Sequence, residues 1–163
     1  MAQLNAVEWA IRPLKKYAVF SGRASRAEYW WFSLATAIVQ IPLTMIDGAL
    51  GDWSPFSTLF SLAILLPSLA VTVRRLHDTD RSGWWLLAMA GVFALIGVMA
   101  VLGRGGPYAG SMAASFTGMI IAILVVLFGS ITFLVFMILP GTEGPNRYGP
   151  DPYGPDSLEE VFA

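Results

Sequence analysis

The sequence predicts an all-α membrane protein, a bundle of four transmembrane helices preceded by an interfacial amphipathic helix. Its 10 basic and 11 acidic side chains all lie outside four long uncharged stretches. The chain is 56% hydrophobic and 13% charged, whereas a soluble domain carries about 25% charged residues. A helix needs roughly 20 apolar residues to cross the hydrocarbon core of a bilayer. We therefore expect one integral membrane domain over residues 1–152, with spans at about 29–46, 53–73, 82–103 and 112–139.

The distribution of Lys and Arg predicts the orientation. Five basic residues precede the first span, three lie between spans two and three, and Arg147 follows the fourth. The loop between spans one and two has none, and the loop between spans three and four has only Arg104. Cytoplasmic loops carry the excess of Lys and Arg. Both termini are therefore expected in the cytoplasm.

Residues 1–20 are expected to form the interfacial helix. Apolar side chains recur at three- and four-residue spacing, at Leu4, Val7, Ile11, Leu14 and Ala18. Arg12, Lys15 and Lys16 would anchor the helix to an anionic leaflet, and Pro13 is expected to bend or divide it. The alternative is a loosely ordered basic leader, because short isolated helices are marginally stable.

The first span has a start signal and an aromatic belt. Ser25 and Glu28 have the spacing of a capping box, and the aromatic run 29–32 follows directly. Trp84 and Trp85 open the third span in the same way. Spans one and two each contain a proline that can kink the helix. Each proline leaves a backbone group without its helical partner, and nearby polar side chains can bond to that group. Gln40 and Thr44 lie near Pro42, and Ser68 and Thr72 lie near Pro67.

The fourth span contains a line of small residues. Gly110, Ala114, Gly118 and Ala122 recur every four residues, which allows another helix to approach closely. We favour packing inside the bundle over homodimerisation. The chain after this span is a Gly- and Pro-rich tail from Gly141 that is expected to form turns. The acidic end, residues 153–163, is expected to be mobile.

The polar chemistry is expected on one membrane face, because the spans contain no ionisable side chain. Three segments, 22–28, 74–81 and 143–151, should converge there as a polar cap. One hypothesis is a site for an anionic ligand or lipid headgroup, formed by Arg23, Arg26, Arg74, Arg75, His77, Arg81 and Arg147. The favoured alternative is an ion-pair network in which these cations pair with Glu28, Asp78, Asp80 and Glu143.

Catalytic chemistry has weak support in the sequence. His77 with Asp78 and Asp80 could form a carboxylate-rich metal site, but a hydrogen-bonded structural histidine is favoured. The chain has no cysteine, and no serine nucleophile elbow or phosphate-binding glycine loop is present. No catalytic residue, metal, cofactor or nucleic-acid partner is therefore expected.

Three motifs resemble a known family. The segments 20–32, 74–85 and 141–152 are similar to the signatures of the domain-of-unknown-function 805 family, which are small bacterial inner-membrane proteins. The resemblance covers roughly residues 14–152. It implies a polytopic helical membrane protein in the bacterial inner membrane and implies no reaction. The Gly-rich loop around Arg104 departs from the pattern.

Three functional hypotheses remain from the sequence, and the third of them is a membrane enzyme that uses His77 with Asp78 and Asp80. The first is a non-enzymatic membrane protein that binds a partner, a second copy of itself or anionic membrane lipid through the polar cap. The second is a small transporter or channel that uses the proline-containing spans one and two.

Overall fold

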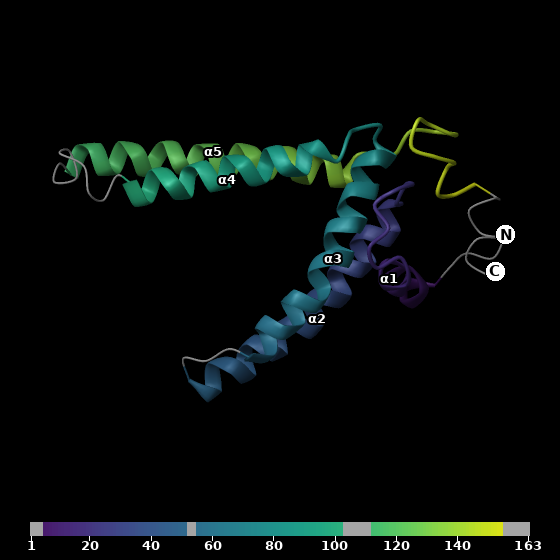
Figure 1. Cartoon of the computed structure of the whole chain (residues 1–163), viewed down its shortest axis with the longest axis horizontal. Helices are drawn as coiled ribbons and strands as arrows, with labels where there is room; N and C mark the ends of the chain where they lie inside the picture. The colour runs from purple at the N-terminus through teal and green to yellow at the C-terminus, as the bar shows by residue number, and fades with distance from the viewer. Residues whose placement is uncertain (1–4, 52–54, 103–111, 155–163) are drawn as a thin grey trace. The chain divides into compact units, whose positions relative to one another are not determined.

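All regular secondary structure in the described residues is helical, apart from an isolated bridge between Asn146 and Gly149. The structure, a computed structural model, describes residues 5–51, 55–102 and 112–154. The prediction of an all-α fold is therefore confirmed for these residues (Figure 1). The helices are α1 Ala6–Lys15, α2 Arg26–Leu50, α3 Pro55–Asp78, α4 Trp84–Leu102 and α5 Met112–Ile138.

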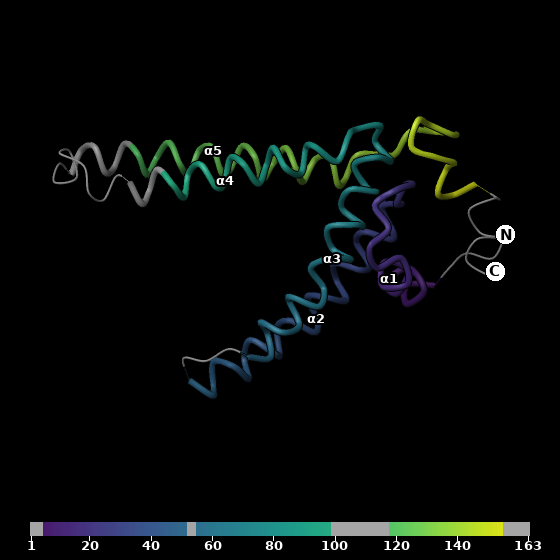
Figure 2. Tube along the Cα trace, viewed as in Figure 1, coloured from purple at the N-terminus to yellow at the C-terminus, as the bar shows by residue number. Residues whose placement is uncertain are grey.

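The chain forms two compact units. The first contains residues 1–82 and 140–163, and the second contains residues 83–139. In the first unit, α2 and α3 run antiparallel and α1 packs across them, mainly against α2 (Figure 2). In the second unit, α4 and α5 lie side by side. The single domain over residues 1–152 stays a prediction.

Three helices are long and apolar enough to cross a membrane. They are α2, α3 and the stretch Gly118–Ile138 of α5. The described apolar stretch of α4, Trp84–Val98, is shorter. A helix of 25 residues, the length of α2, is about 37 Å long, which exceeds the hydrocarbon thickness of about 30 Å. Three candidate spans are thus present in the described residues, and the count of four stays a prediction.

The first helix is shorter than expected and is not divided by proline. It begins after Asn5, whose side chain accepts a hydrogen bond from the backbone amide of Glu8 at 2.8 Å. The Glu8 carboxylate accepts from the Asn5 amide at 2.7 Å, which completes a capping box. Pro13 lies inside α1 and is buried. Helix α1 ends three residues before Ala18, the last position of the predicted apolar face, and Leu4 lies outside the described residues.

The predicted capping box of α2 forms only by half. The Ser25 hydroxyl accepts a hydrogen bond from the Glu28 amide at 3.1 Å. The Glu28 carboxylate bonds to Arg74 instead of the Ser25 amide. A buried carboxylate gains more from a guanidinium than from a neutral amide, so the tertiary contact replaces the local one.

Helix α3 extends beyond the predicted end of its span. The uncharged stretch ends at Val73, but the helix continues to Asp78. Arg74, Arg75 and His77 are therefore held on helical backbone, where the sequence predicted a loop. The chain turns immediately afterwards, with Asp80 in the left-handed region at φ 56°.

Pro67 leaves the carbonyl of Ala63 without its helical donor, because proline has no amide hydrogen. The hydroxyl of Thr72 donates to Ser68 at 2.7 Å and does not reach that carbonyl. Tyr17, in the segment after α1, donates its hydroxyl to the Ala63 carbonyl at 2.6 Å. The expectation that Ser68 and Thr72 serve this proline is therefore wrong.

The second unit is an antiparallel helix pair. Trp85 near the start of α4 packs edge to face against Phe136 near the end of α5, with ring centroids 5.4 Å apart. A Cβ added at Gly129 would lie 3.6 Å from the Met89 sulfur, which is ordinary contact. The predicted line of small residues is only partly described: Gly118 is exposed, and the side chain of Ala114 and all of Gly110 and Arg104 lie outside the described residues.

Candidate functional site

Three distant segments form the polar cap within the first unit. The loop before α2, the end of α3 and the tail from Pro140 to Gly154 meet there. The Ala24 amide donates to the Arg74 carbonyl at 3.0 Å, and the Thr142 amide donates to the Asp78 carbonyl at 2.9 Å. The antiparallel pairing of α2 and α3 brings the first contact about, because the start of one helix lies beside the end of the other.

The centre of the cap is a buried carboxylate between two arginines. Asp78 accepts a hydrogen bond from Nε of Arg23 at 3.0 Å and another from Nη1 of Arg75. All three side chains are buried. Arg23 also donates to the carbonyls of Thr142 and Gly144, both at 2.5 Å. Arg23 thus connects the loop before α2, the end of α3 and the tail.

A second buried ion pair joins the helices. Nη1 of Arg74 lies 2.6 Å from a Glu28 carboxylate oxygen, and both side chains are 1% exposed. Nε of Arg12, on α1, lies 3.8 Å from the other oxygen of Glu28. Glu28 therefore ties α1, α2 and α3 together. We call Arg12, Arg23, Glu28, Arg74, Arg75 and Asp78 the ion-pair network.

The tail fits closely against Asp78. A Cβ at Gly141 would lie 2.2 Å from an Asp78 carboxylate oxygen, so glycine is needed for this approach. The side-chain amide of Asn146 donates to the His77 carbonyl at 3.0 Å and to the Thr142 hydroxyl at 2.9 Å. The turns predicted for the Gly- and Pro-rich tail are confirmed, and their bonds hold the tail on the end of α3.

His77 has structural partners. Its Nδ1 lies 3.1 Å from the Gly22 carbonyl, and its ring stacks on Tyr148 with centroids 3.9 Å apart and planes 2° from parallel. Its neighbour Asp78 is occupied by two arginines. In the part of the chain that the structure describes, no three His, Asp or Glu side chains are placed to hold a metal ion. The geometry favours the structural reading of His77.

Arg147 and Asp80 form a separate pair at the edge of the cap. Nε of Arg147 lies 2.9 Å from the Asp80 carboxylate, and the two side chains are 61% and 48% exposed. The same guanidinium donates to the Asp80 carbonyl at 2.7 Å and lies 4.9 Å from the Tyr148 ring centre. An exposed pair of this kind contributes little to stability.

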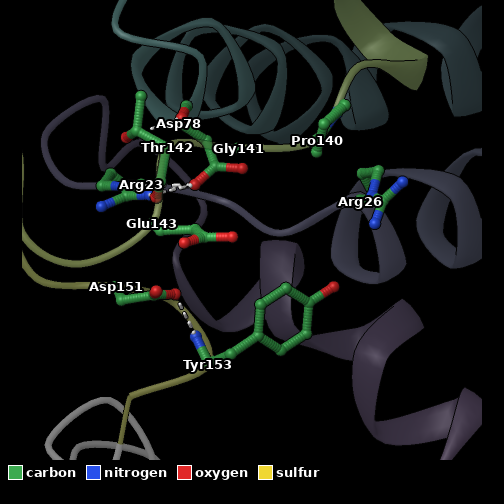
Figure 3. A pocket seen from close by; sticks show the side chains of 9 residues that line it. All are labelled: Arg23, Arg26, Asp78, Pro140, Gly141, Thr142, Glu143, Asp151 and Tyr153. Atoms are coloured by element: carbon green, nitrogen blue, oxygen red, sulfur yellow. Dashed lines mark hydrogen bonds and ion pairs between the residues drawn. The ribbon is translucent and has the colours of Figure 1, made fainter.

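A cavity of about 200 Å³ opens between the loop before α2 and the tail (Figure 3). Arg26 lies on one side of it, and Glu143 and Asp151 lie on the other, with Tyr153 beside them. The cavity is lined by Arg23, Arg26, Asp78, Pro140, Gly141, Thr142, Glu143, Asp151 and Tyr153. Glu143 is exposed and forms no ion pair with the described residues.

The predicted site residues thus separate into two groups. Arg23, Arg74 and Arg75 are buried in the ion-pair network, while Arg26 faces the cavity. Arg81 is half-buried at the turn after α3. Neither Asp151 nor Tyr153 was predicted as a site residue. Asp151 ends the segment 143–151 that was expected in the polar cap, and Tyr153 begins the end 153–163 that was expected to be mobile. The sequence reading also overlooked Asp47, whose buried carboxylate accepts hydrogen bonds from the amides of Phe56 and Ser57, at 3.2 and 2.8 Å.

Comparison with protein families identifies the chain. The family described as "Protein of unknown function (DUF805)" matches residues 17–150, a range that includes the whole of the ion-pair network except Arg12. The chain belongs to the DUF805 family. The resemblance inferred from the three motifs is confirmed. All three motifs lie inside the matched range, except for residues 151 and 152 at the end of the third motif.

The chain is also similar to proteins of Escherichia coli. The chain is 51% identical over 82 residues to "Inner membrane protein YhaI" of strain K12, covering 50% of this chain and 70% of that protein. It is 42% identical over 87 residues to "Inner membrane protein YhaH", covering 50% of this chain and 71% of that protein. "Uncharacterized protein YiiR" is 31% identical over 132 residues, or 79% and 82% of the two chains. These names and the three apolar helices identify a membrane protein with inner-membrane relatives. No solved structure matches the chain.

Proposed function

We propose that this DUF805 protein is a non-enzymatic, four-span protein of the bacterial inner membrane whose polar cap binds a phosphate-containing lipid headgroup. Both termini and the cap lie on the cytoplasmic side in this proposal. The observation that carries it is the cavity beside Arg26, at the end of two membrane-length helices. The start of α2 and the end of α3 are where these helices leave the hydrocarbon core, so the cavity lies at the level of headgroups.

The ion-pair network explains why only part of the predicted ligand site takes part. Arg23, Arg74 and Arg75 are buried and hydrogen-bonded within the protein. Removing one of them from its carboxylate would leave a buried charge unpaired, which costs several kcal/mol. These three arginines therefore form the frame, and the exposed Arg26 is the cation that contacts the headgroup.

Helix α1 supports a position in the membrane interface. Val7, Ile11 and Leu14 are 63%, 42% and 42% exposed, while Trp9 and Arg12 pack inward. The apolar side chains at this spacing form one face of the helix. A face of this kind inserts at the boundary between headgroups and acyl chains, which would hold the cap close to the lipid.

The direct test is lipid retention. The full-length protein, purified in a mild detergent, is expected to keep phospholipid that native mass spectrometry detects. Arg26→Gln is expected to lower this retention without changing the thermal unfolding midpoint. The control is Arg104→Gln, which removes a cation of the loop that is expected on the opposite membrane face. Equal retention by both variants would contradict the proposal.

Transport remains the second hypothesis, with weaker support. The proline-containing helices α2 and α3 bear few polar groups, and several of these bond within their own helix. The hydroxyl of Thr44 donates to the Gln40 carbonyl at 2.8 Å, and that of Thr72 donates to Ser68. A hydroxyl that donates to a carbonyl of its own helix no longer has a hydrogen to donate to a polar solute.

A further inference from the structure

The charges around the cavity are divided between the protein's own pairs and groups that face the opening. Asp78 and Arg23, on its wall, are bonded to each other. Arg26, Glu143 and Asp151 remain, and they bear one positive and two negative charges. A purely anionic ligand would meet Arg26 but would also face two carboxylates, so the site is poorly matched to a single negative charge.

Arg26 forms the cationic side. It is the first residue of α2 and is exposed. In the described ranges it forms no ion pair. A positive side chain at a helix N-terminus is opposed by the helix dipole, whereas an anion at that end is stabilised. A phosphate placed beside Arg26 would be attracted by the guanidinium and by the dipole together.

Glu143, Asp151 and Tyr153 form the opposite side. Asp151 is oriented by hydrogen bonds from the amides of Gly144 and Tyr153, at 3.2 and 2.9 Å. Glu143 is exposed, and Tyr153 is 57% exposed, with its ring centroid 6.2 Å from that of Trp9. Two carboxylates and an aromatic face are the groups that bind an ammonium ion. Figure 3 places them across the cavity from Arg26.

We propose that the cavity selects a zwitterionic headgroup in which a phosphate is joined to a primary amine, as in phosphoethanolamine. The phosphate lies against Arg26, and the ammonium donates hydrogen bonds to Glu143 and Asp151. This inference rests on the proposed function and refines its ligand. A primary ammonium has N–H groups to donate, which a quaternary ammonium lacks, so a choline headgroup binds less well.

The test compares three lipids that share the same acyl chains. Delipidated full-length protein is titrated with phosphatidylethanolamine, phosphatidylglycerol or phosphatidylcholine, and native mass spectrometry measures the bound fraction. Phosphatidylethanolamine is expected to bind most tightly. Arg26→Gln and Glu143→Gln should each weaken it about tenfold, the effect of losing one charge-assisted hydrogen bond. Arg104→Gln, in the loop expected on the opposite membrane face, should leave binding unchanged.

The variants also separate the two ends of the ligand. Glu143→Gln should weaken the binding of phosphatidylethanolamine and strengthen the binding of phosphatidylglycerol, because it removes a negative charge that repels phosphatidylglycerol. Free phosphoethanolamine is a further arm. If free phosphoethanolamine competes with the lipid, the headgroup alone is enough for binding and a soluble ligand is possible. If it does not compete, the acyl chains contribute to binding and the lipid is the ligand.

Two results would overturn the inference. They differ in whether they also contradict headgroup binding, the proposed function. Phosphatidylglycerol binding as tightly as phosphatidylethanolamine, with no effect of Glu143→Gln, would refute zwitterion selection and leave headgroup binding intact. Failure of all three lipids to bind would refute both. Circular dichroism of each variant must match the wild type, which is expected because Arg26 and Glu143 are exposed.

Discussion

The hydroxyl of Tyr17 donates a hydrogen bond of 2.6 Å to the carbonyl of Ala63. This carbonyl lies four residues before Pro67, at the position where an α-helix would receive the missing amide. A side chain from the segment after α1 thus repairs a defect inside a candidate membrane helix. Within a bilayer an unpaired carbonyl is costly, so this contact couples the placement of the N-terminal segment to the integrity of α3.

Tyr17→Phe should destabilise the protein by about 1–3 kcal/mol, because it leaves the Ala63 carbonyl unpaired. The measurement is unfolding in mixed micelles with increasing sodium dodecyl sulfate. Tyr148→Phe is the matched control, since its ring stack on His77 needs no hydroxyl. Pro67→Ala restores the backbone donor, so in that background Tyr17→Phe should lower the free energy of unfolding by less than it does in the wild type. An equal cost in both backgrounds would show that the bond does not serve the proline.

Asp78→Asn should be much more damaging than Asp80→Asn, which removes the charge and keeps a side chain that tolerates the left-handed backbone at φ 56°. The first leaves Arg23 and Arg75 buried without their carboxylate, at an expected cost of about 3–5 kcal/mol. The second removes an exposed pair with Arg147 and should cost at most about 1 kcal/mol. The same unfolding assay measures both. Similar losses for the two variants would mean that the ion-pair network is not the frame of the cap.

Gly141→Ala should release the tail from the end of α3. The new methyl group would collide with the Asp78 carboxylate, which lies 2.2 Å from its position. Hydrogen exchange at the Thr142 amide, bonded to the Asp78 carbonyl, is expected to accelerate. Gly48→Ala is the control, because a Cβ there has no neighbour within 4 Å. Unchanged exchange in the Gly141 variant would argue against this close packing.

Asp47→Ala should destabilise the far end of the α2–α3 pair by about 1 kcal/mol, the usual cost of losing a helix cap. The carboxylate accepts from the amides of Phe56 and Ser57 in the first turn of α3. Asp47→Asn keeps one acceptor oxygen and should retain most of the stability. Thermal unfolding in detergent distinguishes the two. The expectation fails if Asn is as damaging as Ala.

The helices could be predicted because lipid excludes charge. The uncharged stretch 29–46 lies within α2, the stretch 53–73 lies in α3 from Pro55 onward, and the stretch 82–103 contains α4. The ends were less predictable, since charged residues can continue a helix once it leaves the hydrocarbon. The extension of α3 from Val73 to Asp78 is of this kind, and it places the Arg75–Asp78 pair three residues apart on one helix.

The partners within the cap could not be predicted individually. The sequence contains several arginines and acids near one face, and every pairing among them is electrostatically reasonable. Glu28 bonds to Arg74, 46 residues away, instead of its own helix cap, because the crossing of α1, α2 and α3 buries both groups. The roles of Asp47 and Tyr17 could not be predicted for a related reason. Each bonds to the backbone of another helix, and a backbone partner can be any residue type.

Arg23 bonds to the Gly144 carbonyl across a separation of 121 residues. Helices α2, α3, α4 and α5 are synthesised in that interval, so Arg23 lacks one of its partners during most of synthesis. Asp78 similarly precedes Thr142, which bonds to its backbone carbonyl. Closure of the cap therefore follows synthesis of the intervening helices. A chain in which one of them fails to insert would leave these two charged side chains open to quality-control proteases.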